Sequence, residues 1–223
     1  MNKKVLITGG TGMIGSLILD LCLQSKEVDE VVLISRRSIG IQHHKLIECI
    51  VSDPLELSQF KTHLNDVNIV FYCLGVYTGK VPPLEFRKIT VDYPLALAKI
   101  LVETAPGLRF CLLSGQGADR SEKSKLMFAR DKGAIENKLS ALEHLSFHAF
   151  RPGYIYPVVP RKEPNLGYSF SRWLYPVIRL LGKNLSITSI QLAQVMFTVG
   201  LNGNEKEILE NKDMVVIAES IMR

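Results

Sequence analysis

A strand-like run that ends in a cluster of glycines constrains the fold of this chain more than any other feature. The apolar run 5–7 leads into the cluster, and a segment with apolar residues at helical spacing follows. The spacing Gly10-x-Gly12-x-x-Gly15 fits the fingerprint in which a strand, a tight turn and a helix start hold a pyrophosphate. Free N–H groups and the helix dipole attract phosphate there. The alternative is an ordinary glycine-rich turn. We expect a dinucleotide to contact Gly9, Gly10, Thr11, Gly12, Met13, Ile14 and Gly15.

Composition places the chain among globular proteins with a full core. It has 223 residues, of which 47% are hydrophobic and 22% charged, so we expect one domain over residues 1–223. Lys and Arg number 27 against 22 Asp and Glu, a net charge of +5. This mild excess suits anionic ligands but gives no reason to expect nucleic acid as a partner.

The cysteines and the apolar runs exclude two other classes of site. Cys22, Cys49, Cys73 and Cys111 form no CxxC pair, and three of them lie in or beside strand-like runs. They are typical of reduced core residues, so we expect no metal site. No run approaches the ~18 apolar residues of a membrane-spanning helix. We therefore expect a cytoplasmic protein with no transmembrane segment; the sequence leaves its oligomeric state open.

Strand-like and helix-like segments alternate along the first two thirds of the chain. This pattern predicts an α/β fold, a doubly wound parallel sheet of the Rossmann type with helices on both faces. After Arg151 several prolines mark irregular chain, and residues from about 152 to 223 are expected to form a small C-terminal lobe that covers the substrate side. We expect strands over 4–8, 30–35, 46–51, 68–74, 109–113, 147–150 and 214–218, and helices from the glycine cluster to about 24 and over 54–64, 84–103, 124–142, 168–181 and 189–201.

The residues after the second strand bear on the choice of cofactor. NAD-binding proteins of this type carry an acidic residue about 20 positions past the fingerprint, which binds the ribose 2′-hydroxyl. This chain has Ser35 there, followed by Arg36 and Arg37. Guanidinium groups bind a 2′-phosphate, whereas a carboxylate repels it. We therefore expect NADP(H) rather than NAD(H), although a solvated basic loop has the same composition.

Several motifs together resemble a known family. The spacing Thr8-Gly9-x-x-Gly12-x-x-Gly15 resembles that of the short-chain dehydrogenase/reductase family, in its extended and atypical branches. Later segments keep the order and approximate spacing of the atypical branch: Ser114-Gly115-Gln116-Gly117-Ala118-Asp119, Lys132-Gly133 and Arg151-Pro152-Gly153. The resemblance covers most of the chain and is strongest between residues 3 and about 155.

This resemblance implies further cofactor contacts. Asp53, after the third strand, is expected to accept a hydrogen bond from the adenine amino group; capping a helix that starts at Pro54 is the alternative. The family passes its backbone beside the adenine ribose at Cys73, Leu74 and Gly75, and beside the nicotinamide at Arg151, Pro152, Gly153 and Tyr154.

The resemblance also implies a catalytic set, with one departure. Family members use a serine that polarises the substrate oxygen, a tyrosine that gives or takes the proton, and a lysine four residues after the tyrosine. The matching serine is Ser114 and the matching lysine is Lys132, but Phe128 holds the tyrosine position. Phenylalanine has no proton to donate, which puts the chemistry in question but not cofactor binding. Tyr154 or Tyr156 would be the nearest substitutes, unless both only pack.

Two further segments have more than one interpretation. Asp92 either lies beside the active site or caps a helix that restarts at Pro94. The aromatic stretch 168–181 is a lid, a partner surface or a membrane-surface helix, and a core helix over the pocket is the plainer alternative.

These expectations lead to two functional hypotheses. The first is a cytoplasmic NADP(H)-dependent oxidoreductase that acts on a small carbonyl or enone. The second is a non-catalytic NADP(H)-binding protein that senses redox state or regulates a partner. Phe128 separates them, because the first needs another acid and the second needs none.

Overall fold

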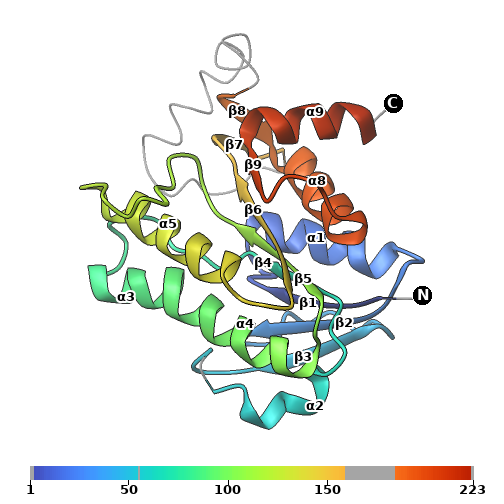
Figure 1. The fold of residues 1–223 in the computed structure, drawn as a ribbon. Helices are drawn as coiled ribbons and strands as arrows, with labels where there is room; N and C mark the ends of the chain where they lie inside the picture. Colours follow the sequence, from blue (N-terminus) through green and yellow to red (C-terminus); the bar gives the residue numbers. More distant parts are fainter. Residues whose placement is uncertain (1–2, 55, 159–183, 222–223) are drawn as a thin grey trace.

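A seven-stranded parallel sheet forms the centre of the molecule in a computed structural model that describes residues 3–54, 56–158 and 184–221 (Figure 1). The strand order is β3-β2-β1-β4-β5-β6-β9, and every neighbouring pair is parallel. The predicted α/β fold is therefore confirmed. The strands are β1 (Lys3–Thr8), β2 (Val28–Ser35), β3 (Leu46–Ile50), β4 (Ile69–Tyr72), β5 (Leu108–Leu113), β6 (Leu145–Arg151) and β9 (Ile208–Glu210).

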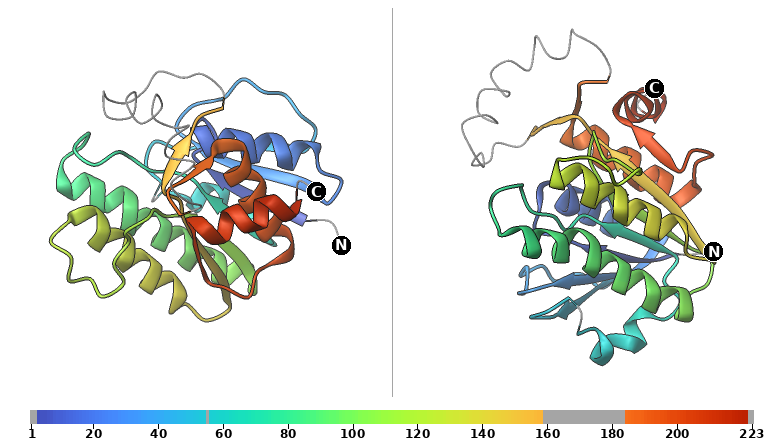
Figure 2. Two further views of the ribbon diagram at one scale, coloured as in Figure 1. Left: turned by 90° about the horizontal axis from the view of Figure 1, so that it is seen from above. Right: turned by 60° about the vertical axis from the view of Figure 1, so that its left-hand side comes forward.

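Helices cover both faces of this sheet (Figures 1 and 2). One face carries α1 (Met13–Gln24) and α8 (Ser189–Asn202), with α9 (Asn211–Ile221) packed beside α8. The other face carries α2 (Lys61–Leu64), α4 (Tyr93–Thr104) and α5 (Met127–Ser140). A short helix α3 (Pro83–Arg87) runs through a π-helical turn at Lys88–Asp92 into α4, which confirms the long helix expected over 84–103.

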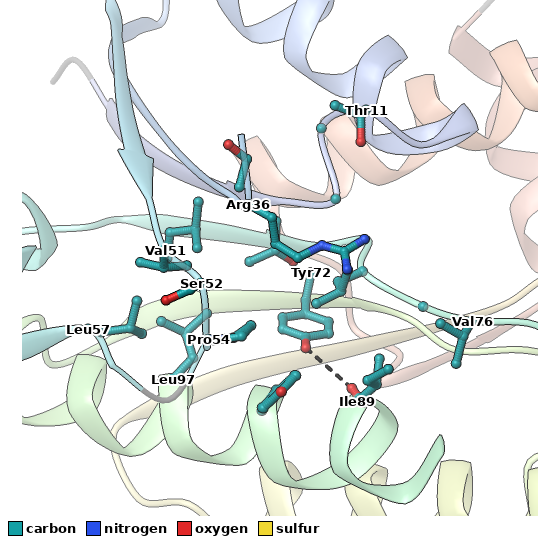
Figure 3. Close-up of a pocket in the computed structure, with 18 of the residues that line it drawn as sticks. Thr11, Arg36, Val51, Ser52, Pro54, Leu57, Tyr72, Val76, Ile89 and Leu97 are labelled. Carbon is teal, nitrogen blue, oxygen red and sulfur yellow. Dashed lines mark hydrogen bonds between the residues drawn. The ribbon is translucent and has the colours of Figure 1, made fainter. Parts of the chain in front are cut away.

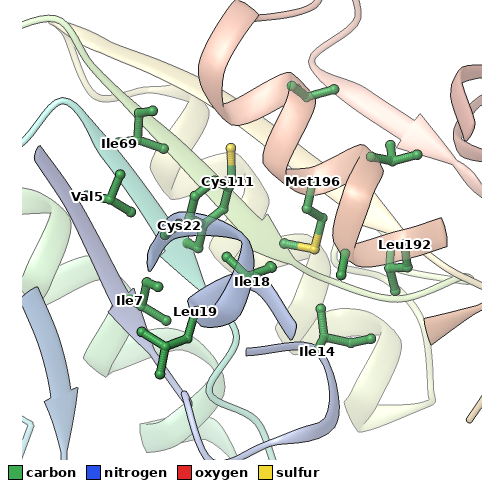
Figure 4. Packing of buried hydrophobic residues seen from close by; sticks show 14 of the residues in the cluster. Val5, Ile7, Ile14, Ile18, Leu19, Cys22, Ile69, Cys111, Leu192 and Met196 are labelled. Carbon is green, nitrogen blue, oxygen red and sulfur yellow. The ribbon is translucent and has the colours of Figure 1, made fainter. Parts of the chain in front are cut away.

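Alternating side chains of the strands build the two layers of the core. Val5 and Ile7 of β1 point into the layer under α1 and α8, whereas Leu6 between them points into the layer under α4. Figure 4 shows Ile14 and Ile18 of α1 packed in the first of these layers. Because successive strand side chains face opposite ways, the continuous apolar run of β1 is what a strand buried on both faces requires.

The sequence interpretation is wrong at two elements. Residues 214–218 belong to helix α9 and not to a strand; Met214 and Ala218, four positions apart, are both buried on one helix face. The edge strand is instead β9, which ends at the residue immediately before α9 begins. The helix expected over 54–64 is also shorter, because helical structure begins only with a 3₁₀ turn at Ser58–Phe60 before α2.

The C-terminal part contributes to the main core. A small parallel sheet of β7 (Tyr154–Tyr156) and β8 (Ser186–Thr188) leads into α8, which packs on α1. The stretch 168–181, for which four interpretations were open, lies outside the described residues. Over the ranges described, no helix has the length and apolar character needed to cross a membrane. No cluster of three or more metal-binding side chains occurs in those ranges either.

Candidate cofactor site and the residues beside it

The turn between β1 and α1 is built around glycines that leave no room for side chains. Gly9 has φ +73°, and a Cβ there would lie 2.7 Å from the carbonyl group of Cys73. A Cβ on Gly15 would lie 2.2 Å from the carbonyl oxygen of Gly9. At Gly12 a Cβ would lie 3.1 Å from that same oxygen, which is a tight contact, but it would meet no other atom within 4 Å, and the residue itself is exposed. The turn is thus tight on its inner side and accessible on its outer side.

Helix α1 starts at this turn without a side-chain cap. Gly12 is its extended N-cap residue and supplies no side chain, so the first N–H groups of the helix face outward beside the accessible Gly12. A buried hydroxyl lies near them: Thr8 is 4% exposed, and its Oγ1 has no hydrogen-bond partner within the described chain. Unpaired buried polar atoms are rare in native proteins, which fits a polar ligand at this turn. Ile14, by contrast, is buried in the core.

A cavity of about 500 Å³ opens beside the glycine turn (Figure 3). The turn residues Gly9, Gly10 and Thr11 line one side of it. Its apolar wall is made by Leu57, Tyr72 and Leu97, which come from three different elements. A cavity that combines an apolar wall with backbone N–H groups at one end suits a flat ring attached to a phosphate.

Arg36 reaches into this cavity, and Arg37 does not line it. Figure 3 shows the Arg36 side chain extending from the end of β2 toward the Tyr72 ring. Arg37 is exposed, and its carbonyl oxygen accepts a hydrogen bond of 2.8 Å from the hydroxyl of Ser35. Both side chains are exposed, but only that of Arg36 lines the cavity.

Asp53 does not start a helix, so its alternative role as an N-cap is wrong. No helical structure follows at Pro54, and the Asp53 carboxylate instead lies 3.1 Å from the ammonium of Lys88. This hydrogen bond raises the pKa of Lys88, whose ammonium also lies 5.3 Å from the centre of the Tyr93 ring. The residues on both sides of Asp53, Ser52 and Pro54, line the cavity.

The remaining predicted contacts on this side come from the end of β4. The backbone of Cys73 and Leu74 packs against Gly9, and Leu74 and Gly75 line the cavity. Cys73 is half-buried, and desolvation of its thiol raises the pKa to about 12, which keeps the thiol protonated near neutral pH. Asp92 is exposed at the end of the π-helical turn and makes no cap hydrogen bond, so its N-cap interpretation is wrong as well.

A second group of predicted residues lies where β5 ends against α5. The Phe128 ring and the Lys132 side chain pack side by side over Gly115: a Cβ on Gly115 would lie 3.2 Å from Phe128 Cζ and 3.6 Å from Lys132 Cδ. The Lys132 ammonium lies 5.8 Å from the centre of the Phe128 ring. Phe128 and Lys132 thus share one helix face, as their spacing predicts. The β5-end residue that faces them is Gly115 and not Ser114.

Ser114 points to a different partner. Its hydroxyl donates a hydrogen bond of 2.5 Å to the carboxylate of Glu136, which is fully buried. Glu136 also forms a charge-assisted pair with Arg151, whose guanidinium reaches Glu210 at 3.0 Å on its other side. The side chain of Arg151 therefore holds β6, α5 and β9 together.

Lys132 sits at the edge of this buried network. Its ammonium donates to the carbonyl oxygens of Ser114, at 2.9 Å, and Leu113, at 3.5 Å. Burial lowers the pKa of Lys132 to about 8, and the nearby Glu136 carboxylate opposes this shift. A lysine whose pKa is close to neutral can both release and take up a proton near pH 8.

The segment after β6 is fixed by backbone contacts. The N–H of Gly153 donates to the side chain of Asn211 at 2.9 Å, and a Cβ on Gly153 would lie 2.5 Å from the Leu185 carbonyl oxygen. The Pro152 carbonyl accepts from the N–H of Gln116 at 3.0 Å. Tyr154 starts β7, so this segment leaves the sheet beside the end of β5.

Sequence reasoning missed two residues of this region. Glu136 follows Lys132 by four positions, so helical spacing already places it on the face of Phe128 and Lys132, where a buried carboxylate is unusual. Asn211 is fully buried and donates to the Ser186 carbonyl at 2.9 Å, but nothing local in the sequence marks it.

The strand order, the glycine turn and the adjoining cavity define a dinucleotide-binding α/β protein. The model of the NAD dependent epimerase/dehydratase family matches residues 5–124, more than half of the chain. The chain belongs to this family, which supports binding of NAD(P) and confirms the resemblance drawn from the motifs.

Relatives and solved structures extend this comparison. Protein HTATIP2 of Rattus norvegicus is 27% identical over 216 residues, covering 95% of this chain and 87% of that protein. Protein FMP52, mitochondrial, of Debaryomyces hansenii is 24% identical over 209 residues, covering 87% of this chain and 89% of that protein.

Among solved structures, a short chain dehydrogenase family protein from Francisella tularensis is similar with a TM-score of 0.64 and 14% identity, over 96% of this chain and 94% of that one. The Bordetella bronchiseptica enzyme WbmF in complex with NAD+ is similar with a TM-score of 0.68 and 13% identity, over 99% and 78%. These likenesses show a shared fold.

Proposed function

We propose that this protein binds NADP(H) in preference to NAD(H), with the pyrophosphate at the glycine turn and the adenosine in the 500 Å³ cavity. The observation that carries the proposal is the position of Arg36, which extends into the cavity from the strand end where NAD-binding relatives of this fold place an acidic residue. Asp53, Leu74 and Gly75 would then contact the adenosine, as the family resemblance implies.

Calorimetric titration with NADPH and NADH tests this preference. We expect NADPH to bind at least about tenfold more tightly, because a charge-assisted contact to the 2′-phosphate contributes about 1.5–3 kcal/mol. Equal affinity for both cofactors would contradict the assignment of Arg36.

The proposal extends to chemistry: an oxidoreductase that acts on a small carbonyl or enone. When bound, the reduced nicotinamide would supply hydride. The support is the arrangement of Phe128 and Lys132 on one face of α5 beside the end of β5. Arg151 ends β6, and Pro152, Gly153 and Tyr154 follow it next to that strand end, where the family passes its backbone beside the nicotinamide. Lys132 would contact both the cofactor and the reacting group.

One observation favours a second candidate, a non-catalytic NADP(H)-binding protein that senses redox state or regulates a partner. The two positions that face each other here, Phe128 and Gly115, carry no hydroxyl, and the Ser114 hydroxyl hydrogen goes to Glu136. A single-turnover assay decides between the candidates: NADPH-loaded protein is mixed with ketones, quinones and enones, and NADPH absorbance is followed. Oxidation of bound NADPH supports the enzyme, and none across the panel supports the second candidate.

A cytoplasmic location is part of the same proposal. Imaging of a tagged copy tests it, and accumulation in mitochondria, the compartment named for the Debaryomyces relative, would contradict it.

A further inference from the structure

Hydride transfer to a carbonyl leaves an oxyanion that must receive a proton, and the described chain offers few donors for it at the end of β5. The Phe128 ring has none, and Gly115 has no side chain. The Ser114 hydroxyl hydrogen is held by Glu136 at 2.5 Å. A short hydrogen bond to a buried carboxylate keeps that hydrogen from a ligand on the other side.

The ammonium of Lys132 is the polar hydrogen donor that remains on this face of α5. Its stem passes the tip of the Phe128 ring, since both groups approach the same point above Gly115. Two of its contacts are backbone carbonyls, at 2.9 and 3.5 Å, which accept hydrogen bonds without taking up a proton. An ammonium has three hydrogens, so it can turn one of them toward a ligand.

We propose that Lys132 itself is the proton donor and acceptor of this site, in the place where a tyrosine hydroxyl acts in enzymes of this type. The proposal rests on the oxidoreductase function proposed above. In the reductive direction the carbonyl carbon receives hydride from the reduced nicotinamide, which becomes oxidised, and the C=O π pair moves to oxygen. That oxygen takes a proton from the Lys132 ammonium, an alcohol and a neutral amine result, and the amine regains a proton from water.

The charges around Lys132 suit this role. Glu136 lies one turn further along α5, but Arg151 from β6 pairs with its carboxylate and offsets its charge. On α5 beside Lys132, the carboxylate of Asp131 is paired with Arg87 of α3 at 2.6 Å, and Lys88 from the π-helical turn is paired with Asp53. Neighbouring charges therefore offset the desolvation of the Lys132 ammonium only slightly, and its pKa is lowered to about 8.

A nuclear magnetic resonance titration measures the protonation of Lys132 without any turnover. Protein labelled with 13C and 15N in lysine is titrated from pH 6 to 11, and the Lys132 signal is identified by its loss in Lys132→Arg. We expect a midpoint near 8 for this signal. A Lys132 signal that stays protonated beyond pH 10 overturns the proposal.

Turnover across pH gives the second readout. Reduction of a ketone by NADPH should slow as pH rises through the Lys132 midpoint, because the ammonium is lost, and oxidation of the matching alcohol should accelerate through the same midpoint. Lys132→Arg keeps the positive charge, but a guanidinium does not release its proton, so we expect kcat to fall roughly 10²- to 10⁴-fold. Lys138→Arg is the matched control and should change neither kcat nor KM.

Three outcomes would overturn the assignment. Lys132→Arg that retains its kcat would do so, as would a rate that is independent of pH between 7 and 9. A loss of rate in Tyr154→Phe with no effect of Lys132→Arg would assign the proton to Tyr154. Calorimetric titration with NADPH distinguishes these results from failure of the proposed function. If the protein binds no NADPH, the proposed function is wrong; if it binds NADPH and one of the three outcomes is seen, only the assignment of Lys132 is wrong.

Discussion

Ser114 and Glu136 share a hydrogen bond of 2.5 Å in which the hydroxyl of the first donates to the buried carboxylate of the second. The same carboxylate holds Arg151, so one buried charge joins the end of β5, helix α5 and the end of β6. The site beside Lys132 therefore depends on a group that contacts neither the cavity nor the glycine turn.

Removing the charge of Glu136 should destabilise the fold. In Glu136→Gln the half-buried guanidinium of Arg151 keeps Glu210 as its charged partner, and breaking a buried pair typically costs about 3–5 kcal/mol, an upper limit for this partly exposed pair. Urea unfolding measures the loss. Lys206→Ala is the control, because it breaks the more exposed pair with Asp213 and should cost under about 1 kcal/mol. Equal losses in the two variants would contradict the role of Glu136.

Arg36 and Arg37 should differ in their effect on cofactor binding. Arg36→Ala should weaken NADPH binding roughly 10- to 100-fold and leave NADH binding almost unchanged, because only NADPH carries the 2′-phosphate. Arg37→Ala should have the smaller effect, since Arg37 does not line the cavity. Calorimetric titration of each variant with NADPH and NADH measures the dissociation constants. A larger loss in Arg37→Ala would reverse the assignment of the two arginines.

Substitutions at two glycines of the turn should affect cofactor binding and fold stability to different degrees. Gly12→Val should lose the cofactor at a smaller cost in stability than Gly15→Ala, because its Cβ meets only the Gly9 oxygen, at 3.1 Å, and its side chain lies on the exposed side of the turn where the pyrophosphate is expected. Gly15→Ala should destabilise the fold by on the order of 1–3 kcal/mol, because its Cβ would meet the Gly9 oxygen at 2.2 Å. Gly75→Ala, with open space at its Cβ, is the control for thermal unfolding. Gly12→Val with undiminished NADPH binding would place the phosphate elsewhere.

His148 should make the fold less stable in mild acid. Burial lowers its pKa, and Arg109 adds to this effect against the Lys206 carbonyl and Glu207. Above the unfolded-state pKa of about 6.5 the histidine is neutral in both states. Below that pKa the unfolded chain takes up a proton before the folded chain does. The free energy of unfolding therefore decreases as the pH is lowered, until the pH reaches the lower folded-state pKa.

Urea unfolding at pH 7.5 and 5.5 measures this dependence, and His148→Asn should reduce it. A pH dependence that persists in His148→Asn would point to other groups.

Phe128→Tyr should raise the rate at which the protein reduces generic carbonyl compounds, because it adds a second proton donor beside Lys132. The substitution adds one oxygen next to the Lys132 ammonium, which should lower the pKa of the new phenol, and a positioned acid typically contributes ~10²–10⁴-fold in rate. A ketone and quinone panel with NADPH gives the rates of both proteins. Brisk activity of the wild type, lost in Tyr154→Phe or Tyr156→Phe, would show that another residue has the role.

The parallel sheet and its glycine turn followed from the sequence because their signals are local. A strand buried on both faces is a continuous apolar run in the sequence, and the turn needs glycines at fixed spacing. The prediction of a strand over 214–218 was wrong because it relied on local β propensity. Val215, Val216 and Ile217 are β-branched, but the burial of Met214 and Ala218 follows helical periodicity. Packing on the rest of the chain outweighed β propensity there.

The site beside β5 was only partly predictable. The four-residue spacing placed Phe128 and Lys132 on one helix face, which the contact over Gly115 shows. The direction of the Ser114 side chain was not predictable, because a strand end can turn either of two adjacent residues toward the helix. Its hydrogen bond to Glu136 depends on how β5 packs against α5, and no short sequence pattern encodes that distance.

The packing of Gly9 on the backbone of Cys73 and Leu74 has a consequence for how the chain folds. Strand β1 pairs with β4, more than 60 residues later, so the phosphate turn is complete only after a long loop has closed. A dinucleotide can therefore recognise the assembled sheet but no partly folded form that lacks this pairing. Cofactor present during refolding should leave the folding rate unchanged and slow unfolding instead, so that saturation with cofactor lengthens the lifetime of the native state.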